Sequence, residues 1–351
     1  MAKKTTSSGG TLRKFIITLV IVGVLALGGT ILFYYLRYFG PNVTGNEEYL
    51  YIRTGQNFDD VYHTIQDNGI VKDTATFSWA ARNMKYVGHV KPGKYRLTAG
   101  MSNRKFVRML QLGDQEPVDF KFHVFRTKAQ FAAFTSKNLE LDSFTVLRYL
   151  DSADFVKQYG LNTDNAFVMV MPDSYKMNWN ISADAFFKRF YKHYENFWTA
   201  ERKQQATALN LTQPQVSILA SIVDAEAVYD DEMPTIAGLY LNRLRIGMKL
   251  ESDPTVIFAM GDFTIHRVLN RYLSVNSPYN TYLNKGLPPG PVMLPSVNAV
   301  KAVLNYEKSD YIYMVAKEDF SNRHNFANNV AEHNKNAQKF RKALDERNIK
   351  K

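Results

Sequence analysis

Carboxylic acids are the side chains in this sequence that are best suited to catalysis. The candidates are Glu226, Asp224, Asp253 and Asp173. A carboxyl group can donate or accept a proton, and two of them flanking a glycosidic bond are the usual arrangement in glycoside hydrolases. Sequence spacing alone does not tell which pair, if any, lies at the separation that such a reaction requires.

Other kinds of catalytic site have little support. The chain contains no cysteine, so a thiol nucleophile, a disulfide and a Cys-based zinc site are excluded. The spacing of His324 and His333 does not match a zinc motif such as H-E-x-x-H. There is no glycine-rich phosphate loop and no G-x-S-x-G motif. We therefore expect neither a metal nor a cofactor.

Glu226 lies on a predicted helix that covers residues 215–227. Thr212 and Pro214, just upstream, supply a capping hydroxyl and a first-turn proline. At helical spacing, the face that carries Glu226 is otherwise apolar. Its other members are Leu219, Ile222 and Val223. Asp224 is rotated by about 200° from Glu226 and stands on the small, polar side of the helix.

The position of Glu226 has two interpretations. In the first, the apolar stripe simply ends there, and the carboxylate lies at the rim or in a salt bridge. In the second, apolar surroundings raise the pKa of the carboxyl group, so that it can donate a proton near neutral pH. The helix alone favours the first interpretation, because acidic residues are rarely buried without a partner.

The longest apolar segment lies near the start of the sequence. No charged residue occurs from Phe15 to Leu36, a run of about 22 residues that would span roughly 33 Å as a helix and cross a bilayer. It ends in the aromatic stretch 33–39, where a cleavable signal peptide would have small residues. We therefore predict an uncleaved transmembrane anchor at 15–36, preceded by a cytoplasmic tail at 1–14.

Basic residues predict the orientation of this anchor. Lys3, Lys4, Arg13 and Lys14 precede the apolar segment, whereas only Arg37 follows it closely. The positive-inside rule then places the N-terminus in the cytoplasm and the remainder of the chain outside.

The composition is typical of folded domains with a basic surface. The 351 residues are 45% hydrophobic and 13% aromatic, which suffices for one large or two modest domains. Lys and Arg total 44 against 33 Asp and Glu, a formal net charge of +11. This charge suits an anionic lipid surface or a cell-wall polymer. A nucleic-acid partner is not expected, since the sequence has no arginine-rich tract.

The remaining chain mixes short strands and helices, which predicts an α+β fold class. A strand at 49–53, a glycine turn and two helices follow the order of the small LysM module, and predict a LysM-like α/β subdomain at 47–115. A larger mixed α+β domain is expected at 116–345. Within it, residues 168–171 predict an apolar strand, and residues 252–256 predict a turn.

Eight short motifs occur in an order that resembles the YceG-like family, the endolytic murein transglycosylases. Any one of them is weak evidence, but the ordered set covers the chain from about residue 47 to its end. The motifs are Pro92-Gly93-Lys94-Tyr95, Pro172-Asp173-Ser174-Tyr175, residues 219–226, residues 241–248, Ser252-Asp253-Pro254-Thr255-Val256, Tyr279-Asn280-Thr281-Tyr282, residues 286–291, and His324-Asn325-Phe326 with Glu332-His333-Asn334.

The resemblance implies a role for Glu226. In the family the helix usually reads A-S-I-[IV]-E-K-E, and its second glutamate, the catalytic one, corresponds to Glu226. The first glutamate is Asp224 here, and the lysine between them is Ala225. This departure leaves the role of Asp224 open but keeps the catalytic position.

The resemblance also implies a substrate, a location and partners. Family members are anchored in the bacterial cytoplasmic membrane by a single pass, bind peptidoglycan glycan strands, and are expected to have partners in wall synthesis. They cleave the β-1,4 bond between N-acetylmuramic acid and N-acetylglucosamine and leave a 1,6-anhydro end without adding water. One carboxyl group, here Glu226, acts first as acid and then as base. Asp253, Tyr279 and Asn280 are candidates for binding the substrate, and a purely structural role is equally supported for them. Asp224 is a further candidate, which we expect to support Glu226.

Two other functions remain open. The chain would be a membrane-tethered scaffold if its LysM-like unit bound the wall and residue 226 had no chemical role. It would be a true hydrolase if Glu226 worked with Asp224 or Asp253 to activate water. The mass of the products separates these possibilities, because hydrolysis adds water and the transglycosylase reaction does not.

Overall fold

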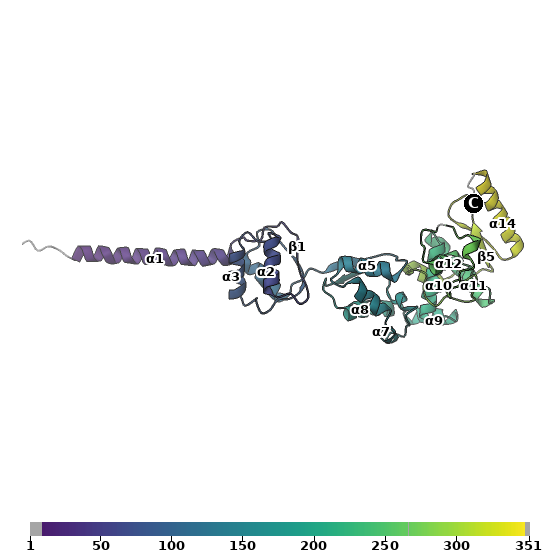
Figure 1. The fold of residues 1–351 in the computed structure, drawn as a ribbon, viewed down its shortest axis with the longest axis horizontal. Helices are drawn as coiled ribbons and strands as arrows, with labels where there is room; N and C mark the ends of the chain where they lie inside the picture. Colours follow the sequence, from purple (N-terminus) through teal and green to yellow (C-terminus); the bar gives the residue numbers. More distant parts are fainter. Residues whose placement is uncertain (1–8, 266, 348–351) are drawn as a thin grey trace, which may run out of the picture. The chain divides into compact units, whose positions relative to one another are not determined.

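A computed structural model of the chain describes residues 9–265 and 267–347. Residues 1–8, which belong to the predicted cytoplasmic tail, lie outside the described residues. The chain divides into two compact units. The first contains the residues up to Val118 together with Asn178–Asn180, and the second contains Asp119–Met177 and the residues from Ile181 onward. Figure 1 shows the elements of each unit.

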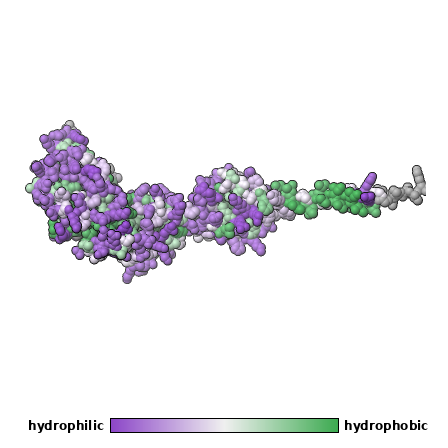
Figure 2. Space-filling view, turned by 180° about the vertical axis from the view of Figure 1, so that it is seen from behind, coloured by the Kyte–Doolittle hydropathy of each residue, from purple (hydrophilic) through white to green (hydrophobic). Residues whose placement is uncertain are grey.

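The first unit begins with one long helix, α1 (Gly9–Phe39). Its segment Leu12–Phe39 is the only part of the described chain that is long and apolar enough to cross a membrane, and none of its most apolar part is buried. In Figure 2 most of this helix is green, the colour of hydrophobic residues. An exposed helix that is apolar all round is typical of a lipid-facing segment.

Helix α1 extends beyond both ends of the segment predicted as the membrane anchor, 15–36. The helix begins before residue 15 and continues past residue 36 to Phe39. Its last turn is extended by a hydrogen bond from the Gly40 N–H to the Leu36 carbonyl at 2.8 Å. Pro41 follows, and because proline has no N–H and disfavours helical geometry in the residue before it, the helix stops there.

The rest of the first unit is a two-stranded sheet with three helices. Its elements are β1 (Tyr49–Ile52), α2 (Phe58–Asp67), α3 (Thr74–Asn83), β2 (Gly93–Arg96) and α4 (Asn103–Leu112). Strands β1 and β2 pair antiparallel, with Tyr49 opposite Arg96. Buried side chains that include Ile52, Phe77 and Phe106 form a single hydrophobic core under this sheet. The unit can therefore bury apolar surface of its own.

The second unit is mainly helical in its first half. It contains β3 (Val118–Lys121), which starts at the unit boundary, α5 (Lys128–Asn138), α6 (Ser143–Leu150), α7 (Ala153–Lys157), the 3₁₀ helix η1 (Ala166–Met169), β4 (Ser174–Met177), α8 (Ala183–Phe197) and α9 (Ala200–Ala208). Strands β3 and β4 form a two-stranded sheet. The aromatic face of α8 is buried, which agrees with its helical spacing.

The second half of this unit carries the candidate site. It contains α10 (Gln213–Glu226), η2 (Asp230–Glu232), α11 (Met233–Arg245), α12 (Asp253–Met260), η3 (Asn270–Tyr272), α13 (Val297–Leu304), β5 (Tyr313–Ala316), β6 (His324–Ala327) and α14 (Val330–Glu346). Strands β5 and β6 pair antiparallel. The predicted mixture of helices and strands is confirmed, and so is the apolar N-terminal helix.

Two local predictions were wrong. Residues 168–171 do not form a strand, because the buried segment Ala166–Met169 is a 3₁₀ helix. A short apolar run has no period that distinguishes a strand from a buried helical turn. Residues 252–256 are not only a turn, because α12 begins at Asp253. Pro254 falls in the first turn of that helix, where its missing N–H costs nothing.

Helix α10 forms the centre of the second unit. It begins at a capping box, in which Thr212 and Gln215 satisfy each other's backbone N–H groups, and every residue from Val216 to Val223 is buried. It packs against α11, α12 and α13. The polar side that the sequence predicted is therefore buried as well, with Ser221 fully enclosed. The first and last turns of the helix lie outside the core.

Candidate active site

The C-terminal end of α10 places Glu226 in a small pocket. The helix ends at Glu226, and Ala227 has extended backbone geometry, so the side chain leaves the packed part of the helix. The pocket has a volume of about 190 Å³, and its other lining residues include Asp253, Tyr282 and His324. One strongly held helix thus brings a carboxyl group to a cavity that a substrate group can enter.

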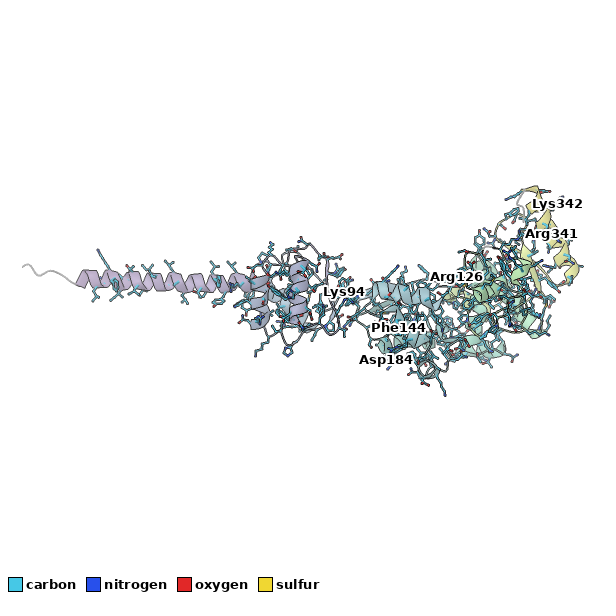
Figure 3. The ribbon with its side chains drawn as sticks, in the orientation of Figure 1. Lys94, Arg126, Phe144, Asp184, Arg341 and Lys342 are labelled. Carbon is cyan, nitrogen blue, oxygen red and sulfur yellow. The ribbon has the colours of Figure 1, made fainter. Side chains whose placement is uncertain are left out.

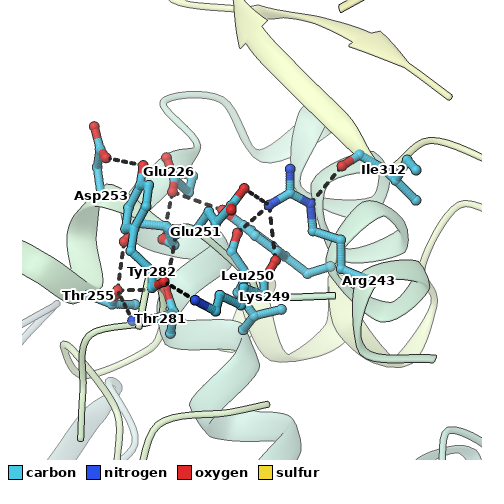
Figure 4. A network of polar contacts seen from close by, with 12 residues as sticks. Glu226, Arg243, Lys249, Leu250, Glu251, Asp253, Thr255, Thr281, Tyr282 and Ile312 are labelled. Atoms are coloured by element: carbon cyan, nitrogen blue, oxygen red, sulfur yellow. Dashed lines mark hydrogen bonds and ion pairs between the residues drawn. The ribbon is translucent and has the colours of Figure 1, made fainter. Parts of the chain in front are cut away.

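Two hydroxyl groups hold the Glu226 carboxyl group in place. The Tyr240 hydroxyl donates to Oε1 at 2.9 Å, and the Ser252 hydroxyl donates to the same oxygen at 2.7 Å. Tyr240 and Ser252 are both buried. Figure 4 shows the carboxyl group within a network of polar contacts. Since both donors bind Oε1, Oε2 is the oxygen that remains for a proton.

Burial raises the pKa of Glu226. The hydrogen bonds from Ser252 and Tyr240 stabilise the charged form and oppose this shift, while the nearby negative charge of Asp253 adds to it. His324 lowers the pKa of Glu226, because a positive charge there favours the carboxylate. The net direction is upward, which favours a carboxyl group that is able to donate a proton.

Asp253 is a second carboxyl group in the same pocket. It is the first residue of α12, and its Oδ1 accepts a hydrogen bond from the Tyr282 hydroxyl at 2.7 Å. Burial raises the pKa of Asp253, and the hydrogen bond from Tyr282 reduces this shift. The structure therefore brings together Glu226 and one of the three other carboxylates that the sequence offered.

A network of threonines positions Ser252. The Ser252 N–H donates to Thr281 Oγ1 at 3.0 Å, and the Thr255 hydroxyl donates to the Ser252 carbonyl at 2.6 Å. Thr255 and Thr281 are themselves linked at 2.8 Å. Lys249 donates to the Tyr282 carbonyl at 2.8 Å, on the same loop (Figure 4). These contacts fix the hydroxyl that binds Glu226.

Arg243 connects three segments around the pocket. Its Nε donates to the Ile312 carbonyl at 2.6 Å, and its Nη1 donates to the Leu250 carbonyl at 2.7 Å. It also pairs with Glu251 at 3.3 Å. The side chain is buried, and it lines the pocket. A buried guanidinium with several carbonyl acceptors holds α11, the following loop and the approach to β5 in one arrangement.

His324 and Glu232 form a pair that the sequence did not reveal. The backbone N–H of His324 donates to Glu232 Oε1 at 2.8 Å, and the ring Nδ1 of His324 lies 3.0 Å from Glu232 Oε2. The side chain of Glu232 is only 6% exposed. The carboxylate therefore orients the imidazole ring through Nδ1, and His324 lines the pocket. The sequence motif that contains His324 was visible, but nothing in it pointed to Glu232.

Asp224 lies outside this pocket. Its Oδ2 accepts a hydrogen bond from the Ser296 N–H at 2.6 Å, at the start of α13. Burial raises the pKa of Asp224, and the contacts with Ser296 oppose the shift. In the structure, the carboxylate joins α10 to α13, and it does not line the cavity that contains Glu226.

Asn280 and Tyr279 also lie outside the pocket. Asn280 is fully buried, and its amide donates to the Leu273 and Val275 carbonyls at 2.9 and 2.8 Å. Tyr279 lines a separate cavity of about 350 Å³ and packs against Phe258. Burial and the nearby charge of Asp164 raise the pKa of Tyr279 to about 12. Neither side chain lies beside Glu226, and their binding roles stay predictions.

Asp173, the fourth acid considered, has its Oδ2 3.2 Å from His193 Nε2 and does not line the Glu226 pocket. Across residues 9–265 and 267–347, no group of three or more His, Asp or Glu side chains is arranged to hold a metal ion. The pocket thus offers three carboxyl groups, from Glu226, Glu251 and Asp253, together with the imidazole of His324 and two tyrosine hydroxyls. This set can transfer protons within a small polar cavity.

Comparisons with known proteins show which family and which relatives this chain is similar to. The model of the YceG-like family matches residues 50–339. An endolytic murein transglycosylase of Bacillus subtilis is 26% identical over 315 residues, covering 84% of this chain and 85% of that protein. One of Streptococcus pneumoniae, strain D39, is 27% identical over 366 residues, covering 92% of this chain and 64% of that protein. This chain therefore spans about two thirds of the pneumococcal relative.

A solved structure agrees with the fold. The crystal structure of a YceG-like protein from Listeria monocytogenes superposes with a TM-score of 0.57 at 27% sequence identity. The match covers 82% of this chain and 98% of that one.

Proposed function

Because the chain belongs to the YceG-like family, we propose that it is a membrane-anchored lytic transglycosylase that cuts peptidoglycan glycan strands internally. The relatives named endolytic murein transglycosylase support the reaction class. The observation that carries the proposal is the Glu226 carboxyl group, held by Tyr240 and Ser252 in a pocket where burial raises its pKa. The bond that is broken is the β-1,4 bond between N-acetylmuramic acid and N-acetylglucosamine.

In the first half of the reaction, Glu226 acts as the acid. Its Oε2 donates a proton to the glycosidic oxygen, and the bond between that oxygen and C1 of the muramic acid residue breaks. The N-acetylglucosamine residue leaves with a free 4-hydroxyl. The burial that raises the pKa of Glu226 keeps this proton available.

In the second half, the same group acts as the base. The 6-hydroxyl of the muramic acid residue attacks C1, and its proton passes to the Glu226 carboxylate. The new bond from O6 to C1 closes the 1,6-anhydro ring, Glu226 regains its proton, and no water is consumed. The Tyr240 and Ser252 hydroxyls stabilise the carboxylate between the two steps, because they donate hydrogen bonds to it.

His324 and Asp253 complete the pocket in this proposal. Glu232 orients the imidazole ring of His324, so that Nε2 can bind a substrate hydroxyl or oxygen. Asp253, held by Tyr282, lies where it can accept a hydrogen bond from an acetamido N–H. Of the predicted substrate-binding residues, Asp253 therefore has the strongest support. Asp224, Tyr279 and Asn280 remain candidates that would act from outside the Glu226 pocket.

The organisation of the chain follows from the same proposal. Helix α1, predicted as a single-pass anchor at 15–36, would hold the protein in the cytoplasmic membrane with the tail 1–14 inside. The region 47–115 would be the LysM-like subdomain, supported by its order of strand, two helices and strand. The region 116–345 would be the catalytic domain, facing the wall. Partners in wall synthesis would be reached from the same side of the membrane.

One alternative has a specific observation in its favour. Since Asp253 shares the pocket with Glu226, a hydrolase could use it to activate water, with Glu226 as the acid. The scaffold alternative has less support, because it gives no reason for a carboxyl group held in a pocket at position 226.

The direct test is digestion of purified peptidoglycan by the parent protein and by Glu226→Gln. The parent should release glycan fragments with 1,6-anhydro ends, and the folded variant should release almost none. If Glu226→Gln digests the wall as fast as the parent does, Glu226 is not the acid. Binding to the wall without any new chain ends in the parent would favour the scaffold.

A further inference from the structure

The end of α1 is firmly joined to the first unit by buried polar contacts. The amide of Asn103, at the start of α4, donates to the Arg37 carbonyl at 3.0 Å. Asn42 donates to Asn103 Oδ1 at 2.7 Å, and both asparagines are buried. The last turn of the apolar helix is therefore held in a fixed position against α3 and α4.

Aromatic side chains surround the same junction. Trp79 of α3 packs against Tyr38 with a ring separation of 4.8 Å and against Tyr34 at 5.6 Å. Tyrosine and tryptophan are enriched at the boundary between membrane and water, where one side of the ring is apolar and the other is wet. This packing places the junction at the depth of the lipid headgroups if α1 spans the bilayer.

A cavity of about 360 Å³ lies at this junction. Phe33 and Leu36 of α1 form its apolar side, and Arg37 and Lys72 supply positive charge. The guanidinium of Arg37 stacks over the Phe33 ring at 4.2 Å, and Lys72 is exposed. The cavity therefore combines an apolar wall with two cations.

The cations of the cavity have no acidic partner in the described chain. None of the ion pairs found among residues 9–265 and 267–347 involves Arg37 or Lys72. The acid in the lining, Asp73, accepts a hydrogen bond from the Thr76 N–H at 2.9 Å and caps α3. Arg104, stacked on Phe39 at 5.1 Å, adds a third cation at the same end of α1.

We infer that this cavity binds the headgroup of an anionic phospholipid. Arg37 and Lys72 would pair with the phosphate, and Phe33 and Leu36 would contact the first part of the acyl chains. A free phosphate ion would use the cations but not the apolar wall, which is why the chemistry favours a lipid. The inference rests on the proposed membrane anchoring by α1 and not on the catalytic role of Glu226.

Such a site would fix the orientation of the first unit. The helix, the two asparagines and the bound lipid would together hold the unit against the outer surface of the membrane. The first unit would then not rotate freely about a flexible tether.

The test uses the full-length protein in neutral detergent micelles, titrated with phosphatidylglycerol or phosphatidylcholine. Native mass spectrometry counts the bound lipids. The parent should retain one phosphatidylglycerol in preference to phosphatidylcholine. The double variant Arg37→Gln/Lys72→Gln should bind phosphatidylglycerol about thirty-fold more weakly, because each of the two cations near a membrane contributes about a fivefold factor.

Matched variants separate charge from other effects. Lys94→Gln removes a lysine of β2 on the side of the first unit away from α1 (Figure 3), and it should leave lipid binding unchanged. The swap Arg37→Lys/Lys72→Arg keeps both charges and should retain the preference. Equal retention of the two lipids by the parent would overturn the site, and so would equal weakening by Lys94→Gln or by the swap.

Two further measurements complete the test. Excess inorganic phosphate should not displace the lipid, and if it does, the cavity is a site for free anions. Retention of the parent in vesicles after an alkaline carbonate wash reports on the anchor itself. A protein that stays in the membrane without lipid preference overturns the lipid site alone. A protein that washes off overturns the anchoring on which the site depends.

Discussion

Glu226 and Asp224 stand two residues apart in the last turn of α10, and they face different surroundings. Glu226 accepts hydrogen bonds from two side-chain hydroxyls beside an open pocket. Asp224 accepts one from the backbone of Ser296 at the start of α13. Burial raises the pKa of both acids. A raised pKa therefore does not separate a catalytic acid from a structural one, whereas access to a pocket does.

The largest expected effect is the loss of activity in Glu226→Gln. The glutamine has the same size and can still accept the hydrogen bonds from Tyr240 and Ser252, but it cannot donate a proton to the leaving oxygen. We expect the rate of glycan cleavage to fall by about 10²–10⁴-fold, the range for a general acid. The measurement is the release of anhydro ends from purified peptidoglycan, with circular dichroism to check the fold.

The matched variant Asp224→Asn should behave differently. We expect its rate of cleavage to stay within about threefold of the parent, since Asp224 lies outside the pocket and does not exchange a proton with the substrate there. A loss as large as that of Glu226→Gln would mean that both acids take part in the chemistry, and the contrast between them would be lost.

A smaller effect is expected from the pair His324 and Glu232. His324→Gln should lower kcat by about tenfold, because an oriented polar group in the pocket is removed. It should also shift the alkaline limb of the pH–rate profile to higher pH, since His324 lowers the pKa of Glu226. Glu232→Gln should reproduce part of both effects. A loss of rate with an unchanged pH profile would assign the pair a purely structural role.

Asp224 should matter for the stability of the fold, although we expect little effect of it on the rate of cleavage. Asp224→Ala removes the acceptor of the Ser296 N–H, and we expect the free energy of unfolding to fall by about 1–3 kcal/mol, the cost of an unsatisfied buried group. Asp224→Asn keeps an acceptor and should be close to the parent. The two variants can be compared by urea denaturation, and equal stability of Asp224→Ala and the parent would contradict the structural role.

The smallest effect is a pH dependence that both acids share. The pKa of each is higher in the folded state than in the unfolded chain. The contribution of these two acids to the free energy of unfolding is therefore complete below their pKa in the unfolded chain, about 4. It is lost as the pH rises through their pKa in the folded protein. The variants Glu226→Gln and Asp224→Asn lack one of these titrating groups each. Their free energy of unfolding, measured relative to that of the parent, should therefore increase as the pH rises. A gain on lowering the pH would contradict the direction of both shifts.

The sequence predicted the features that depend on local spacing. Helix α10 and its start at Thr212 follow from the capping hydroxyl and the proline, and the long apolar run predicted α1. The apolar stripe also made Glu226 a candidate, although the helix alone favoured a rim position and the catalytic role came from the family resemblance. These features are visible because each is encoded within one segment of the chain.

Features made by distant segments were not predictable. Glu232 and His324 are 92 residues apart and meet only because η2 and β6 fold together. For Asn280, substrate binding and a structural role were equally supported by the sequence, and only the structure shows that its amide binds backbone carbonyls within its own loop. The burial of Ser221 depends on its hydrogen bond from the Val292 N–H at 3.0 Å, which helical spacing cannot show. Tertiary contacts decided each of these positions.

The mass of the glycan products tests the central claim most directly. Purified peptidoglycan is digested with the parent protein, and the fragments are analysed by mass spectrometry without prior reduction. If Glu226 acts in turn as acid and base, the new ends should be 1,6-anhydro-N-acetylmuramic acid, lighter by one water than hydrolytic ends. Fragments that carry reducing ends would contradict this account and would make Asp253 the base of a hydrolase.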